Sequence, residues 1–227
     1  MNNMIPGSLA NIIILRNDRP TEIFYRQGDN MPFVQAEVND HIKVRVSTAG
    51  PFDRMEVYMS VDGRSVHRNR PADFLNDRGY ILDGQLIIEG YRLDNGTISP
   101  FKVTYPSNSV AAWTSGNTDN AGVIGLAFFR EKEVVMPMNE AFTKEVFSLG
   151  GGDTLRKSPV GMTGDGTKVS HVVEVPFTRA TYHPTQVTQI QYRPLWWLKQ
   201  EGIIRAQSND PNPFPGNDDT GYGFLRK

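Results

Sequence analysis

The stretch from Met55 to Arg130 constrains the fold most strongly, because it consists of short β-strand patterns separated by Asp-Gly turns. Every second side chain of residues 55–61 is apolar, which is the period of a half-buried strand. Asp62-Gly63 follows, and this dipeptide readily supplies the positive φ angles of a type I′ hairpin turn, so residues 64–67 are the expected return strand. Short strands at this spacing, joined by glycine turns, predict a sandwich or a barrel rather than βαβ units.

The same kind of pattern extends to both sides of this stretch. The other expected strands are residues 12–14, 33–38, 41–46, 78–82, 85–92, 98–105, 123–130, 168–177 and 187–192. Asn39-Asp40 and Asp83-Gly84 are expected turns, and residues 123–130 are apolar enough for a central strand. One short helix is expected near 194–201, because Pro194 suits its first position and Gly202 suits the position beyond its end.

These patterns predict an all-β fold, an antiparallel β-sandwich of the jelly-roll or immunoglobulin-like kind with extended N- and C-terminal arms. We expect residues 1–30 to form an N-terminal arm that carries one strand, and residues 31–205 to form the sandwich. Glycine clusters predict a flexible excursion near 136–166. Residues 206–227 are polar and interrupted by proline, and we expect them to form a C-terminal arm.

Composition narrows the classes of function. The chain of 227 residues is long enough to bury a full core, and its formal charge of −1 lacks the basic excess of a nucleic-acid-binding protein. The absence of cysteine excludes disulfides, thiolate metal sites and a cysteine nucleophile. The N-terminus lacks the basic region of a signal peptide, and the apolar run Ile12–Leu15 is too short to cross a membrane. We therefore expect synthesis in the cytoplasm without export, and neither nucleic acid nor membrane as a partner.

No motif in the sequence points to a cofactor or a metal. The histidines are His41, His67, His171 and His183, and none of their spacings is that of a strand or helix metal site. The glycine-rich segment 150–158 lacks the spacing of a phosphate-binding loop. Glu131 and Glu133 leave a glycosidase open as an alternative, because such enzymes need two carboxylates at a defined separation that a sequence does not show. Asn95-Gly96-Thr97 is expected to be a plain hairpin turn.

Aromatic side chains supply the candidate contact residues. Tyr58, Tyr91, Trp113, Trp196 and Trp197 could form a stacking platform for a sugar, although packing in the core or in an interface is the favoured interpretation. Adjacent helical positions cannot both face one side. One of Trp196 and Trp197 is therefore expected to cap the sandwich, and the other to meet a partner or a loop.

Several residues within 55–130 resemble a known pattern. Val61-Asp62-Gly63 is followed by Gly79-Tyr80-Ile81, by Gly84-x-Leu86-x-Ile88-x-Gly90-Tyr91-Arg92, by Phe101-Lys102-Val103 and by Gly122-Val123-Ile124-Gly125. This order resembles a motif of uncharacterised bacterial and phage proteins, which implies a β-sandwich and nothing catalytic. The resemblance is weaker over 158–204, and it does not extend to residues 1–40 or 205–227.

A β core with polar, aromatic-tipped extensions is typical of a subunit in a large assembly. The expected interface residues are Trp113, Trp196, Trp197, Phe214, Tyr222, Phe224 and Leu225. The leading hypothesis is a non-enzymatic virion protein, an auxiliary head protein that decorates or cements a bacteriophage capsid. It would be homo-oligomeric, made in the host cytoplasm and bound to other virion subunits. The alternatives are a phage tail or portal-proximal component, a carbohydrate-binding or glycan-active sandwich, and a cytoplasmic bacterial protein with another binding role.

Overall fold

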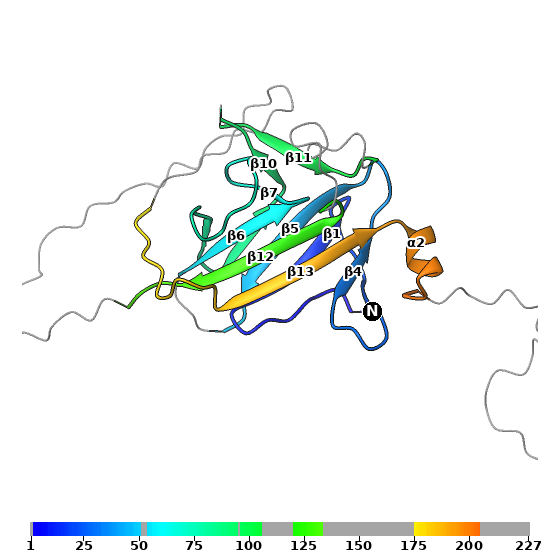
Figure 1. Ribbon diagram of the computed structural model, residues 1–227, viewed down its shortest axis with the longest axis horizontal. Coiled ribbons are helices and arrows are strands. Elements are labelled where there is room, and N and C mark those ends of the chain that lie inside the picture. Colours follow the sequence, from blue (N-terminus) through cyan, green and yellow to red (C-terminus); the bar gives the residue numbers. More distant parts are fainter. Residues whose placement is uncertain (1, 51–53, 95, 106–119, 134–174, 205–227) are drawn as a thin grey trace, which may run out of the picture.

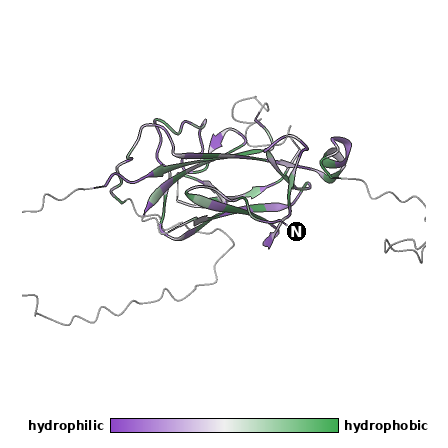
Figure 2. Ribbon diagram, turned by 90° about the horizontal axis from the view of Figure 1, so that it is seen from below, coloured by the Kyte–Doolittle hydropathy of each residue, from purple (hydrophilic) through white to green (hydrophobic). Residues whose placement is uncertain are grey.

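In a computed structural model of the chain, two β-sheets are stacked face to face (Figures 1 and 2). The structure describes residues 2–50, 54–94, 96–105, 120–133 and 175–204. Hydrophobic side chains from both sheets meet between the layers and form one large core cluster, which includes Ile12, Val44, Val57 and Phe128. The expected β-sandwich with one short helix is confirmed.

The first sheet is built around the longest pairing of the N-terminal half. Its strands are β1 (Ala10–Arg16), β2 (Arg19–Pro20), β5 (His41–Thr48), β9 (Gln85–Ile88), β10 (Gly90–Arg92) and β11 (Ile98–Lys102). β1 and β5 pair antiparallel over their whole length, from Ala10 opposite Thr48 to Arg16 opposite Ile42. The other edge of β5 pairs with β11 and β9. This places β5 in the middle of the sheet.

The second sheet is built around a long, largely apolar strand, β12. Its strands are β3 (Ile23–Tyr25), β4 (Pro32–Gln35), β6 (Met55–Val61), β7 (Arg64–Ser65), β8 (Tyr80–Leu82), β12 (Val123–Arg130) and β13 (Gln186–Arg193). β12 lies between β6 and β13 and pairs antiparallel with both. The prediction of a central strand at 123–130 is therefore confirmed.

The pairing differs from the sequence-based expectation in two respects. β4 and β13 run parallel, so the sandwich is not antiparallel throughout. The turns at Asn39-Asp40 and Asp83-Gly84 each lead from a strand of one sheet to a strand of the other, from β4 to β5 and from β8 to β9. By contrast, Asp62 and Gly63 both have positive φ and join β6 to β7 as the expected hairpin. In the two crossing turns only Asn39 and Gly84 have positive φ, so their backbone differs from that of the hairpin.

The N-terminal segment is part of the sandwich rather than an arm. The strand expected at Ile12–Ile14 exists, and as β1 it lies inside the first sheet. Ile5, Leu9 and Ile12 are buried in the main core cluster. The expected arm over residues 1–30 is therefore wrong for this region, because its apolar residues fill the space between the sheets instead of waiting for a partner.

The helix expected near 194–201 is found at its predicted place. α2 (Leu195–Gln200) begins after Pro194 and is followed by Gly202 with a positive φ of 68°. Pro194 stands one position before the helix rather than in its first turn. Leu198, Ile203 and Phe33 form a small second core cluster that holds the helix beyond one end of the sheets (Figure 1).

Three predicted segments lie wholly or partly outside the described residues. The excursion at 136–166 and the arm at 206–227 are not described. The expected strand at 168–177 is described only from Val175 onward, and those residues are not in a strand. On both sides of the undescribed segment the chain is anchored to the sandwich, because the Lys132 amide donates to the Thr178 carbonyl and the Ala180 amide donates to the Arg130 carbonyl.

A buried ion pair joins this returning segment to β6. Glu56 is 1% exposed and faces away from the main core, opposite the apolar residues of its strand. The Arg179 guanidinium donates to both carboxylate oxygens, with Nη2–Oε1 at 2.7 Å and Nε–Oε2 at 2.8 Å. It also donates to the Phe74 and Asp77 carbonyls and lies over the Phe129 ring. The alternation of β6 therefore does not mark a solvent face, because both of its faces are covered.

Candidate functional site

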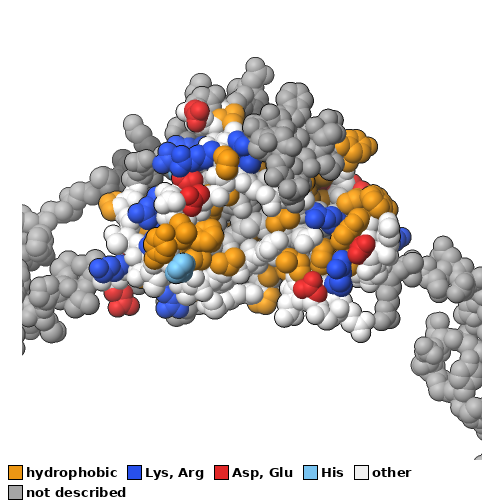
Figure 3. Space-filling model, in the orientation of Figure 1, with side chains coloured by type: hydrophobic (Ala, Val, Ile, Leu, Met, Phe, Trp, Pro, Cys, Tyr) orange, Lys and Arg blue, Asp and Glu red, His pale blue; other side chains and the backbone are white. Residues whose placement is uncertain are grey.

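The candidate site is an apolar groove at one end of the sandwich, where the two sheets separate beside α2. Its volume is about 820 Å³. The walls consist of residues 99–105 from β11 and its continuation, residues 36–38 between β4 and β5, residues 121–124 at the start of β12, and the first turn of α2. Figure 3 shows hydrophobic side chains gathered over this end of the molecule. The groove reaches core residues, including Ile42 and Ile124.

The floor of the groove holds a carboxylate that is bound from several sides. Asp62 lies in the β6–β7 turn, and its Oδ1 accepts hydrogen bonds from the Gly122 amide and the Tyr192 hydroxyl, both at 2.7 Å. The Tyr192 hydroxyl also lies 2.9 Å from Oδ2. Beside them, the Tyr91 hydroxyl donates to the Val61 carbonyl. These bonds join strands of both sheets beneath the groove.

Burial governs the protonation of this floor. It raises the pKa of the Asp62 carboxyl above the ordinary value, and the hydrogen bonds from Tyr192 and Gly122 oppose that shift. Burial likewise raises the pKa of Tyr192, and the Asp62 charge acts in the same direction. At neutral pH the tyrosine therefore keeps its proton and serves as a hydrogen-bond donor to Asp62. The polar groups of the floor are thus hydrogen-bonded to one another.

The two tryptophans of α2 have different environments. The Trp197 ring packs against Phe33, with ring centroids 6.1 Å apart, and against the guanidinium of Arg193. Arg193 in turn donates to the Gly122 carbonyl. Trp196 lies at the groove rim with 64% of its surface exposed. One tryptophan thus packs against the body and its neighbour faces outward, as the helical spacing predicts.

Of the seven expected interface residues, the structure describes Trp196 and Trp197, and it brings both to the groove. Trp113, Phe214, Tyr222, Phe224 and Leu225 lie outside the described residues. The groove residues that sequence reasoning missed are Asp62, Tyr192 and Arg193. Asp62 was interpreted only as a turn residue, and nothing local indicates that a tyrosine 130 positions later binds it.

The expectation that Tyr58 and Tyr91 belong to a stacking platform for a sugar is wrong. Tyr58 is 3% exposed and Tyr91 is 6% exposed, so neither offers a ring face to a ligand. The Tyr58 ring packs edge-on against Phe74, and its hydroxyl accepts a hydrogen bond from the Asp73 amide. Strand alternation placed Tyr58 on the outer face of β6, but the segment that follows β7 covers this face.

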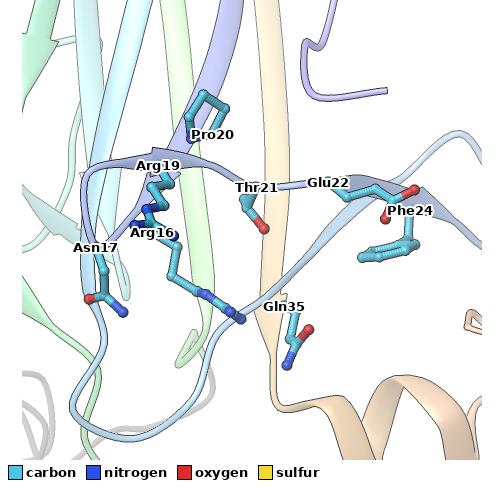
Figure 4. A pocket seen from close by; sticks show the side chains of 8 residues that line it. All are labelled: Arg16, Asn17, Arg19, Pro20, Thr21, Glu22, Phe24 and Gln35. Carbon is cyan, nitrogen blue, oxygen red and sulfur yellow. The ribbon is translucent and has the colours of Figure 1, made fainter. Parts of the chain in front are cut away.

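A second, polar pocket of about 570 Å³ lies by the β1–β2 turn. It is lined by Arg16, Asn17, Arg19, Pro20, Thr21, Glu22, Phe24 and Gln35. In Figure 4 the side chains of Arg16 and Gln35 extend toward each other, whereas Pro20 points away. Amide, guanidinium and carboxylate groups beside an aromatic ring are the kinds of group that orient a polar ligand.

Two of the remaining candidate residues, His67 and Glu131, contact neighbouring side chains. His67 packs edge-on against the Tyr80 ring, while His171 lies outside the described residues. Glu131 is 3.6 Å from Arg54 in an ion pair. Within the described ranges, no three His, Cys, Asp or Glu side chains are arranged to hold a metal ion. In the same part of the chain, no helix has the length and apolar character needed to cross a membrane.

Comparisons with known proteins give no relative for this chain: no family model, no curated protein and no solved structure matches it.

Proposed function

We propose that the protein is a structural subunit of a virus particle, an auxiliary head protein that decorates or cements the capsid of a tailed bacteriophage. The observation that supports this best is the exposure of Trp196, 64%, at the rim of the apolar groove. Tryptophan is enriched among the residues that dominate binding energy in protein interfaces. In this proposal Trp196 and the groove contact a neighbouring virion subunit.

The groove suits binding rather than catalysis. Its aliphatic and aromatic walls, such as Val38, Phe101 and Val103, can pack against side chains of a partner. The ionisable groups of its floor are held by Tyr192, Gly122 and backbone carbonyls. A rigid sandwich beneath the groove also limits the conformational entropy lost on association.

The test compares two equally exposed residues in assembled particles. Trp196 and Val187 are each 64% exposed, and Val187 lies on β13 outside the groove. We expect Trp196→Ala to lower the occupancy of the protein on purified particles at least about tenfold, since interface hot spots contribute about 2 kcal/mol or more. Val187→Ala should leave occupancy unchanged.

Quantitative mass spectrometry of gradient-purified particles measures this occupancy. Absence of the wild-type chain from the particles contradicts the proposal. Its localisation by electron cryomicroscopy to the tail or to the portal vertex would instead support the alternative of a tail or portal-proximal component.

The polar pocket favours a second candidate, a carbohydrate-binding protein. Arg16, Gln35 and Glu22 offer donors and acceptors for hydroxyl groups, and Phe24 provides an aromatic wall. A glycan array with the purified wild-type chain tests this candidate, with Gln35→Ala as the comparison. Binding that is lost in the variant supports it, and an array without signal refutes it.

A further inference from the structure

We propose that the apolar groove binds the C-terminal segment, residues 205–227, of a second copy of this chain. The inference rests on the proposed function, because it names the partner that the groove takes within an assembly. It requires that the segment leave its own subunit away from the groove, that it be long enough to reach a neighbour, and that its side chains match the groove walls.

The described chain ends at Ile204, which packs against the small core cluster and does not line the groove. The first turn of the helix contributes Trp196 and Trp197 to the groove lining. The residues that follow pack elsewhere: Leu198 and Ile203 belong to the cluster around Phe33 in β4. The Glu201 carboxylate also accepts a hydrogen bond from Arg26, just after β3. The segment therefore starts beside β3 and β4, next to residues that do not line the groove.

The segment is long enough to reach a neighbouring subunit. An extended chain covers about 3.3 Å per residue, so the residues from Ile204 to Tyr222 can span up to about 60 Å. This exceeds the diameter of a small domain, which is about 30 Å. Attachment in trans is thus within reach without any rearrangement of the sandwich.

The side chains near the end of the segment match the groove. Tyr222 and Phe224 are separated by Gly223, so in an extended conformation both rings lie on one face about 7 Å apart. Gly223 permits a close approach of the backbone to the groove wall. The volume of about 820 Å³ is within the range of pockets that enclose ligands of a few side chains. Trp196 and Tyr105 at the groove are 64% and 62% exposed, and they offer ring faces and edges for aromatic packing.

The absence of cysteine from the chain makes a direct test possible. One full-length variant carries Thr104→Cys at the exposed groove rim, and another carries Gly223→Cys in the segment. Mixed and oxidised, the two should form a disulfide-linked heterodimer. The matched control replaces the rim position with Val187→Cys, which is exposed but lies outside the groove, and its yield should be at least tenfold lower.

A second measurement does not depend on cross-linking. Light scattering after gel filtration should show an oligomer for the wild-type chain and a monomer for the double variant Tyr222→Ala/Phe224→Ala. A double variant Thr104→Cys/Gly223→Cys that closes only an internal disulfide, in a monomeric chain, overturns the proposal in favour of docking within one subunit. Equal yields for the rim and control positions overturn it as well.

These outcomes are separable from the particle experiment. If the cross-link forms but the protein is absent from particles, the segment exchange holds and the virion function fails. If the protein is on particles and the cross-link does not form, the groove takes another virion subunit and this inference fails.

Discussion

Replacing Arg179 by methionine tests whether the ion pair with Glu56 holds the returning segment to the sandwich. Met is unbranched and fills much of the volume of the Arg stem, so the change removes charge and hydrogen bonds more than packing. In the variant the Glu56 carboxylate keeps the Gly79 amide as a donor, at 2.6 Å, and a distant, mostly exposed Arg78. A carboxylate that is 1% exposed then lacks its main counter-charge.

The expected loss follows from that burial. Breaking a buried pair by removing one partner costs about 3–5 kcal/mol, because the remaining charge stays desolvated. For a chain of this size, a change of 1 kcal/mol lowers the melting temperature by about 2–4 °C. Arg179→Met should therefore melt about 6–20 °C below the wild type. Adding Glu56→Leu to it should recover part of the loss, because an apolar pair no longer carries a buried charge.

Urea denaturation followed by circular dichroism measures these free energies. The matched control is Arg54→Met, because Arg54 pairs with Glu131 at 3.6 Å in a partly exposed position and should contribute at most about 1 kcal/mol. A loss below 1 kcal/mol for Arg179→Met, or one equal to that of Arg54→Met, would refute the reasoning. An Arg179→Met/Glu56→Leu double variant that is less stable than Arg179→Met alone would also refute the reasoning.

Three further predictions concern the groove and its turns. Burial raises the folded-state pKa of Asp62, so its contribution to stability should be complete below the ordinary pKa of 3.8 and be lost as the pH rises through the raised pKa. The difference in unfolding free energy between wild type and Asp62→Asn should therefore change across that pH range. A difference that does not depend on pH would contradict this prediction. Gly122→Ala should lower the melting temperature more than Gly84→Ala does. Both positions have positive φ, but only at Gly122 would a Cβ collide with Arg193 and the Tyr192 carbonyl. Equal losses in melting temperature would count against this reasoning. Trp197→Ala should lower the unfolding free energy by about 2 kcal/mol, which is less than the loss of a fully buried tryptophan. Trp196→Ala should change the unfolding free energy by no more than about 0.5 kcal/mol. The reverse order would show that the roles of the two rings are misassigned.

Sequence reasoning succeeded where the cause is local. The hairpin at Asp62-Gly63 and the helix between Pro194 and Gly202 depend on backbone preferences of the residues themselves. The contrast between Trp196 and Trp197 depends only on helical spacing. The groove was not predicted as a site, because its lining comes from six stretches separated along the chain.

Errors arose where a local pattern has two tertiary outcomes. Asp83-Gly84 has the same turn chemistry as Asp62-Gly63, but β8 and β9 pair with strands of different sheets. The alternation around Tyr58 indicated a solvent face, which a later segment covers. The N-terminal residues were expected to form an arm, but long-range pairing with β5 makes them part of the sandwich.

The sequence by itself determined three things: that the chain forms short strands, where it turns sharply, and which side chains are apolar. These properties arise from neighbouring residues. The tertiary structure decided which sheet each strand joins, which carboxylates become buried and where a groove opens. The physical reason is separation: Glu56 meets Arg179 across 123 positions, and Asp62 meets Tyr192 across 130. Contacts of that range depend on how two sheets close over one core, which no local pattern contains.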